Sequence, residues 1–150
     1  MTAIPDLTDH LGYWLRQVSN HVSHAFARRL ADQDVTVAEW ALMRVLHGEA
    51  PMAPSRIADR MGMTRGAVTK LADRLIAKGL LVREASPEDG RAQTLSLTEP
   101  GAGFVPRLAA LADANDAACF GHLPDADRAA LGRILRDMVR HLGVTTVAID

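Results

Sequence analysis

The sequence predicts a mainly α-helical chain that carries one small β-hairpin. Apolar residues recur every three or four positions through most of the chain, as on the buried face of a helix. Glycines and capping residues interrupt this periodicity at intervals, and only residues 80–97 change to strand-like spacing with turn residues between. Helix, tight turn, helix and hairpin follow in that order, which is the pattern of a winged helix-turn-helix.

The first predicted helix begins at Leu11 and ends near Ala31. No proline interrupts it, and its apolar side chains are spaced by three and four. Such a helix is longer than a small domain needs. Its apolar stripe consists of Leu11, Leu15, Val18, Val22, Ala25, Phe26 and Leu30.

Capping chemistry predicts the next three helices. Thr36 and Glu39 stand at the spacing of a capping box, so a helix begins there and should end near residues 47–48. Pro54 suits the first position of a third helix. Gly62 can close that helix in the left-handed conformation, after which Thr64 can cap the fourth helix. The third and fourth helices are therefore expected to be joined by a tight turn.

A hairpin and two further helices complete the predicted elements. Residues 80–84 and 93–97 read as strands on either side of a turn-rich, charged tip. Thr98 can cap a fifth helix that extends to about Gly121, and a sixth helix starts at residues 123–125. The β-branched, apolar residues 144–150 are assigned no element.

Composition is that of an ordinary soluble globular protein. Of the 150 residues, 48% are hydrophobic and 23% are charged, and the formal net charge is −1. Residues 54–94 hold eight Lys and Arg against five Asp and Glu, a net of +3, so positive charge is concentrated in the predicted helix-turn-helix. No signal-peptide or membrane-spanning pattern is present, and the single cysteine fits a reducing compartment. We expect a cytoplasmic protein with no membrane partner.

The helices at the two ends of the sequence predict a homodimer. Residues 35–98 already form a complete small DNA-binding domain, so the apolar faces contributed by residues 1–34 and 99–150 have little of it left to cover. These faces must be buried against one another, and a long helix often bridges two subunits. We expect residues 1–34 and 99–150 to form a helical dimerisation region, with a monomeric helical domain as the alternative.

Outward positions of the fourth helix are the candidates for reading DNA. The first turns of the second helix of a helix-turn-helix enter the major groove. A long guanidinium can bridge two acceptors on guanine, and further cations can contact phosphates. The alternative is an ordinary solvated helix face. The candidate DNA-binding residues on this helix are Arg65, Gly66, Thr69, Lys70 and Arg74.

The hairpin tip offers one further candidate contact with DNA. Arg91 lies on the tip, where an arginine suits the narrow minor groove. Asp89 and Gly90 are expected to shape the wing, with Asp89 holding either the guanidinium or the turn. An ordinary polar turn is the alternative.

At these residues the sequence resembles the multiple-antibiotic-resistance regulator (MarR) family. The resemblance implies a dimeric transcriptional regulator, usually a repressor, with intertwined terminal helices and a ligand pocket between them and the DNA-binding lobe. Family wings often begin with an aspartate where this chain has Ser86, and often carry a second arginine where it has Gly90. The matching segments are residues 57–65, 68–75, 78–81, 87–91 and 95–101.

A small-molecule site is expected where the first, second and fifth helices meet. Aromatic side chains together with an arginine could hold an aromatic carboxylate, and similar regulators often respond to phenolic compounds. For each candidate the alternative is an ordinary core or surface role. The candidate ligand-binding residues are Tyr13, Trp14, Arg16, His21, Trp40, Met43 and His47.

Catalytic, metal and redox functions find little support in the sequence. No nucleophile elbow, phosphate loop, dinucleotide motif or metal-protease helix is present, so we expect no enzyme and no cofactor. His21 and His24 share a helix face without an evident third ligand, so no metal site is expected. Cys119 falls within an apolar stripe, where a free cysteine usually packs as a small hydrophobe. Taken together, the sequence predicts a dimeric repressor that a small aromatic acid releases from a pseudo-palindromic operator, or else a winged-helix module that binds a protein partner instead of DNA.

Overall fold

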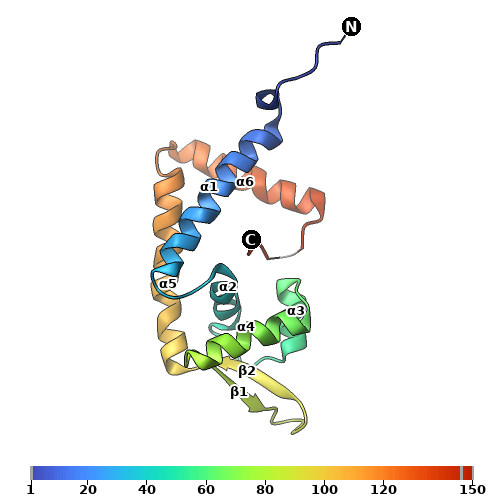
Figure 1. Ribbon diagram of the computed structural model, residues 1–150, viewed down its shortest axis with the longest axis vertical. Helices are drawn as coiled ribbons and strands as arrows, with labels where there is room; N and C mark the ends of the chain where they lie inside the picture. The colour runs from blue at the N-terminus through green and yellow to red at the C-terminus, as the bar shows by residue number, and fades with distance from the viewer. Residues whose placement is uncertain (1, 146, 150) are drawn as a thin grey trace.

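Six α-helices and one hairpin make up the computed structural model, which describes residues 2–145 and 147–149. Figure 1 shows α2, α3, α4 and the hairpin gathered at one end of the molecule, α1 and α6 toward the other, and α5 running alongside both. Within the described residues, no helix has the length and apolar character to cross a membrane. The fold class predicted from the sequence is confirmed. The elements are η1 (Leu7–Asp9), α1 (Leu11–Ala31), α2 (Val37–Leu46), α3 (Pro54–Met61), α4 (Arg65–Ala77), β1 (Leu81–Ala85), β2 (Gln93–Leu97), α5 (Glu99–Phe120) and α6 (Asp125–Leu142).

Local capping determines where α2, α3 and α4 begin and end. The Glu39 N–H donates to the Thr36 hydroxyl at 3.1 Å, and the Thr36 N–H donates to the Glu39 carboxylate at 3.1 Å, which completes the capping box of α2. Gly62 ends α3 in the left-handed conformation with φ 64°. The hydroxyl of Thr64 then accepts from the Ala67 N–H and caps α4. These caps confirm the predicted tight turn between α3 and α4.

The hairpin is antiparallel and is tied to the connector before α3. Leu81 pairs with Leu97, and Arg83 pairs with Leu95, across the two strands. Met52 exchanges backbone hydrogen bonds with Leu95 at 2.9 and 2.8 Å. The base of the hairpin is therefore fixed to the helix-turn-helix.

The main hydrophobic core lies between α2, α3, α4 and the hairpin. Leu30 enters it from the last turn of α1, and Val105 and Leu108 enter it from the first half of α5. We call α2, α3, α4 and the hairpin, with the residues that complete their core, the lobe. Residues on both sides of the predicted domain 35–98 therefore contribute to the lobe. Its buried apolar side chains are Leu30, Val35, Ala41, Leu42, Met43, Leu46, Met52, Ile57, Ala58, Met61, Val68, Leu71, Ala72, Leu75, Leu81, Leu95, Val105 and Leu108.

The start of α5 is pressed against the turn that leads into the hairpin. The Thr98 hydroxyl accepts from the Gly101 N–H and donates to the Gly79 carbonyl at 2.7 Å. A Cβ on Gly101 would lie 2.1 Å from the Leu80 carbonyl oxygen, so only glycine fits there without backbone movement. This contact joins the long α5 directly to the wing.

The arms of the molecule, α1 and α6, have few buried side chains. Leu30 is the only buried residue of α1, and α6 has none among its residues. Their apolar stripes are therefore largely open in a single chain. The exposed apolar residues of the two helices are Leu11, Trp14, Leu15, Val18, Ile134, Leu135, Met138, Val139 and Leu142.

Candidate nucleic-acid interface and the cavity beside it

Helix α4 has one buried face and one exposed face, as the sequence predicts. Val68, Leu71 and Leu75 are buried in the core, and they hold the helix on the lobe. The α3 helix and the turn at Gly62 fix the position of its first turn. The opposite face of α4 is therefore fixed in direction by the packing of the lobe.

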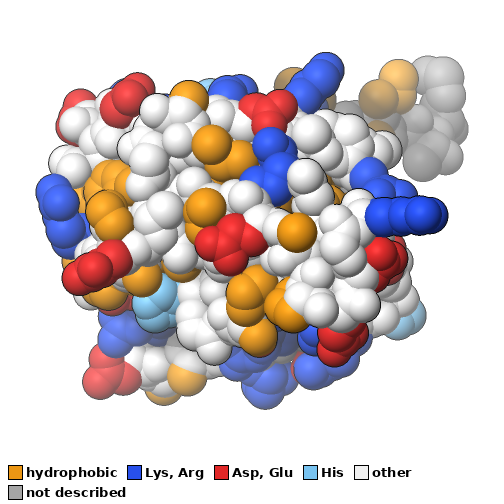
Figure 2. Space-filling model, turned by 90° about the horizontal axis from the view of Figure 1, so that it is seen from below, with side chains coloured by type: hydrophobic (Ala, Val, Ile, Leu, Met, Phe, Trp, Pro, Cys, Tyr) orange, Lys and Arg blue, Asp and Glu red, His pale blue; other side chains and the backbone are white. Residues whose placement is uncertain are grey.

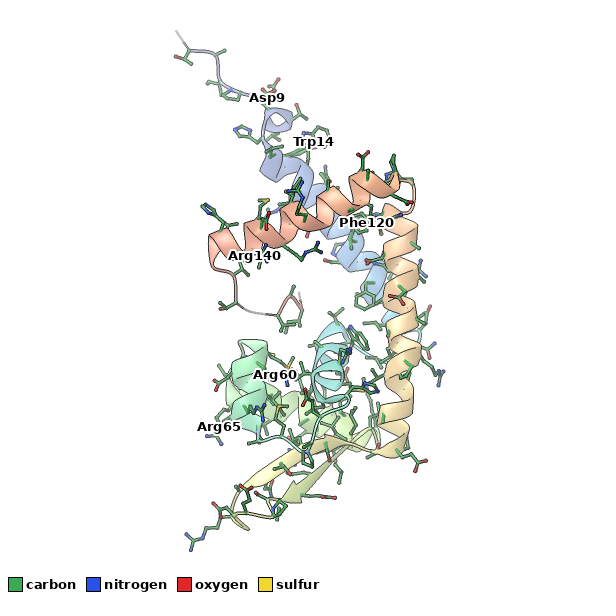
Figure 3. All side chains as sticks on the ribbon, turned by 180° about the vertical axis from the view of Figure 1, so that it is seen from behind. Asp9, Trp14, Arg60, Arg65, Phe120 and Arg140 are labelled. Carbon is green, nitrogen blue, oxygen red and sulfur yellow. The ribbon has the colours of Figure 1, made fainter. Side chains whose placement is uncertain are left out.

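All five candidate DNA contacts on α4 lie on that exposed face. Figure 3 shows Arg65 at the outer end of the α3–α4 unit, pointing away from the body of the protein. The Thr69 hydroxyl donates to the Arg65 carbonyl at 2.9 Å. Its proton is used within the helix, which leaves the methyl group and the oxygen lone pairs for a partner. A Cβ on Gly66 would meet nothing within 4 Å, so the backbone at this turn is open to close approach.

Asp73, whose negative charge is unusual on a phosphate-binding face, pairs with an arginine of the wing. The Arg83 guanidinium donates to the Asp73 carboxylate at 2.8 Å. This ion pair joins β1 to the exposed side of α4. Asp73 therefore holds the wing against α4.

At the wing tip, Asp89 shapes the backbone. Its carboxylate accepts from the Arg91 N–H at 3.0 Å, so it holds the turn rather than the guanidinium. Arg91 is exposed. Gly90 is not among the glycines with positive φ, and a Cβ there would meet nothing within 4 Å. The geometry therefore gives no reason why the predicted wing-shaping position 90 requires glycine.

Positive and negative side chains are interspersed on the hairpin end of the molecule. Figure 2 views this end and shows Lys and Arg separated by Asp and Glu rather than forming one continuous basic patch. Any docking to phosphates therefore depends on individually placed cations more than on a broad positive field.

The end of α4 is anchored by a buried carboxylate. Glu39 is 1% exposed, and the Lys78 ammonium donates to its carboxylate at 2.9 Å and to the Asp34 carbonyl at 2.5 Å. Burial alone raises the pKa of Glu39, but the hydrogen bonds from Lys78 and from the Thr36 backbone outweigh it and lower that pKa below its ordinary value. Glu39 thus caps α2 and holds the residue that ends α4.

A cavity of about 800 Å³ lies between α1, α2 and α5, beside α4. Most of its walls are apolar, and Trp40 supplies an aromatic ring. Three basic side chains, those of His24, Arg44 and Arg74, and one acidic side chain, that of Asp116, also line it. An apolar pocket with a few charged groups is the usual form of a small-molecule site.

The predicted ligand residues are brought together only in part, because Trp40 alone among them lines this cavity. Trp14 lies near the start of α1, as Figure 3 shows, where its indole donates to the Thr8 carbonyl. Tyr13 packs edge-on against it with ring centroids 5.1 Å apart. Met43 is buried in the core, and His47 caps the end of α2. Arg16 and His21 are exposed on α1 and are likewise absent from the cavity wall.

Sequence reasoning placed none of the polar residues of the cavity wall in the ligand site, among them His24, Arg44, Arg74 and Asn115. His24 and Arg44 are single polar residues on amphipathic helices and carry no local signal. Arg74 is predicted from the sequence only as a DNA contact. Asn115 could have been recognised from the sequence, because it is a polar residue at a position that continues the apolar stripe of α5, and it is buried. Its side chain donates to the Val22 carbonyl at 3.2 Å and accepts from Arg29 at 3.3 Å, and so joins α5 to α1.

Metal-binding and thiol chemistry have no assembled site in the described part of the chain. No three His, Cys, Asp or Glu side chains gather there in a way that could hold a metal ion. Cys119 is a free, half-buried cysteine on α5.

The chain is similar to known transcriptional regulators. The sequence profile described as "MarR family" matches residues 33–92. A protein of Thauera aromatica named as a regulatory protein for the hcr operon is 28% identical over 135 residues, covering 89% of this chain and 81% of that protein. The transcriptional repressor IacR of Pseudomonas putida is 26% identical over 130 residues, covering 87% and 78%.

Solved structures share the fold over almost the whole chain. BpsR of Bordetella bronchiseptica, whose DNA binding is described as regulated by 6-hydroxynicotinic acid, has a TM-score of 0.77 at 23% identity and covers 91% of this chain and 97% of its own. A mutant MarR of E. coli complexed with operator DNA has a TM-score of 0.75 at 23% identity and covers 86% and 93%. At this level of identity the likeness establishes the fold.

Proposed function

The chain matches the MarR family profile over residues 33–92 and resembles a transcriptional regulatory protein over most of its length, and from that likeness we propose that it is a member of this family and a homodimeric transcriptional repressor. It binds a pseudo-palindromic operator through α4 and the wing. It releases the operator when a small aromatic acid enters the cavity beside α4.

The exposed face of α4 is the observation that carries this proposal. Arg65, Thr69 and Lys70 lie outward on a helix whose other face is fixed in the core. The position suits insertion into a major groove, with Arg65 directed at a base edge and Lys70 at phosphate. Arg91 on the wing is proposed to reach the adjacent minor groove.

The exposed stripes of α1 and α6 support a homodimer. Leu15 and Val18 on α1 are each 50% exposed, and Met138 on α6 is 42% exposed. Apolar area of this extent on a monomer marks an interaction surface. A second copy of the chain provides the same stripes in complementary positions around a two-fold axis, which would in turn match an inverted repeat in the DNA.

The cavity lining supports an aromatic acid as the ligand. Trp40 and the apolar walls suit an aromatic ring, while Arg44 can pair with a carboxylate. Arg74 also lines the cavity and belongs to α4, the same helix that carries Arg65. A carboxylate held by Arg74 would therefore act directly on the reading helix. Such a ligand shifts DNA binding only if it binds the DNA-free and DNA-bound shapes with unequal affinity.

DNA binding is tested by measuring the affinity for a duplex from the intergenic region beside the gene at several salt concentrations. The dissociation constant should rise steeply between low and moderate salt, because phosphate contacts release counterions. An affinity for an acidic protein partner, together with no affinity for duplex DNA, would favour the protein-binding module instead.

Ligand control is tested by a thermal-shift screen with aromatic acids, repeated in the presence of the operator. A true effector should raise the melting temperature of the free protein and weaken operator binding. An acid that stabilises the protein and leaves operator affinity unchanged would contradict allosteric release.

A further inference from the structure

The chain turns back toward the DNA-reading lobe after α6. Gly143 ends α6 in the left-handed conformation with φ 67°, and Figure 1 shows the described residues near the C-terminal end lying between α6 and the helices α2 and α3. Val147 and Ile149 are half-buried and pack against the core. We call residues 147–149 the strap.

The strap is hydrogen-bonded to the helix-turn-helix itself. The Val147 N–H donates to the Met61 carbonyl at 3.2 Å. Met61 is the last residue of α3, where carbonyl groups lack a partner within the helix. Gly62 and Thr64 follow at once, so the strap is attached next to the turn that positions α4.

The strap also forms part of the cavity wall. Val147, Ala148 and Ile149 line the same cavity as Trp40 and Arg44. A molecule that fills the cavity therefore has to contact the strap or take its place. The strap therefore contacts both the cavity and the end of α3. A molecule that enters the cavity can affect the end of α3 through the strap.

We propose that the strap is a built-in competitor for the cavity, which ties the end of α6 to α3 and is displaced when an aromatic anion enters. Displacement frees the Met61 carbonyl and releases the helix-turn-helix from the arm. This inference rests on the cavity being the ligand site proposed above. It adds that the resting cavity is partly occupied by the protein's own chain.

The seating of the strap is tested first, with no ligand and no DNA, by hydrogen exchange of the Val147 amide in the ¹⁵N-labelled full chain. A strap seated about nine-tenths of the time slows this exchange about 10-fold relative to an unstructured peptide. Ile149→Asp should abolish the protection, because it places a charge against the apolar core. Thr145→Asp is the matched control, since Thr145 is exposed and is not part of the cavity wall, and it should keep the protection. Exchange of Val147 at the unstructured rate in the natural chain would overturn the proposal.

Displacement is tested with anilinonaphthalene sulfonate, an aromatic anion that suits Trp40 and Arg44. If the strap competes with this probe, Ile149→Asp should bind it about 10-fold more tightly than the natural chain, which is the factor expected when the open state rises from about one-tenth to full occupancy. Saturating probe should also remove the protection of Val147. Equal affinity in the variant and the natural chain, or protection that persists at saturation, would overturn the proposal. Ile149→Ala serves as a second variant should Ile149→Asp not fold, and neither measurement depends on operator binding.

Discussion

Leu42 of α2 and Leu142 of α6 are the same side chain in opposite surroundings. Leu42 is fully buried between the helices of the DNA-reading lobe, whereas Leu142 is 66% exposed. The difference extends to their helices, because α2 has five buried residues and the described α6 has none. The lobe is packed within one chain, and the arms leave their apolar faces open. Packing within a single chain therefore buries the apolar side chains of the lobe, but it leaves the apolar stripes of the arms exposed.

Replacing each leucine with alanine tests this comparison most strongly. Leu42→Ala should lower the free energy of unfolding by about 2–5 kcal/mol at every protein concentration, because it leaves a cavity in the core. Leu142→Ala should act instead through the proposed dimer and raise its dissociation constant about 10-fold. Urea denaturation at several protein concentrations and analytical ultracentrifugation measure the two effects. If Leu142→Ala destabilised the dilute chain as much as Leu42→Ala, the distinction between lobe and arms would fail.

Two arginines extend the comparison to DNA binding. Arg65→Ala on α4 should cost about 1–3 kcal/mol of operator binding and relax selectivity at one base position, because it removes a contact with a base edge. Arg28→Ala on α1 is the control, since Arg28 is also exposed but lies on the arm. Fluorescence anisotropy with operator variants measures both. Equal weakening for all sequences would make Arg65 a phosphate anchor, and an equal loss from Arg28→Ala would remove the special role of α4.

Two glutamates sharpen the comparison within the lobe. Glu39→Gln should lower the free energy of unfolding by about 1–2 kcal/mol at neutral pH, because it weakens the buried pair with Lys78. Glu49→Gln should cost little, since the pair of Glu49 with Arg60 is exposed. Because the folded pKa of Glu39 is lowered, its charged form stabilises the fold above the ordinary value of 4.5, and that contribution is lost as pH falls through the folded pKa. The natural chain and Glu39→Gln should therefore converge in stability on acidification, and a gap that stays constant with pH would contradict this.

The wing should show the smallest effect. Arg91→Ala at the tip is expected to weaken DNA binding less than Arg65→Ala, and to reduce the slope of log affinity against log salt by about 1, because a cation in the minor groove displaces about one counterion. A salt titration with the same operator measures this slope. A loss larger than that of Arg65→Ala would make the wing, rather than α4, the main DNA contact.

Elements with local chemical signals could be predicted from the sequence. The capping box at Thr36, the left-handed Gly62 and the cap at Thr64 each depend on residues within a few positions, and each lies where expected. The inward face of α4 also follows from spacing alone. These features depend on short-range sterics and hydrogen bonds, which the order of residues determines directly.

The cavity could not be predicted in the same way, because its wall depends on how distant helices pack. Trp14 has the right chemistry for an aromatic ligand, but it precedes Val22 of the cavity wall by eight residues, about 12 Å along the helix axis. Met43, which is expected in the pocket from its place on the second helix, is instead buried in the core. Val147 carried no local signal at all, since its hydrogen-bond partner Met61 is far away in the sequence. Sequence patterns predict which face of a helix is buried, but they do not predict how far the helices are offset along one another.

Gly101 has a mechanical consequence for the whole molecule. Its backbone meets the Leu80 carbonyl so closely that no side chain fits between them, and Thr98 is bonded to the same turn. The base of the wing and the first turn of α5 are therefore in direct backbone contact. A tilt of α5, the helix that runs from the lobe to the arms, would therefore also move the base of the wing.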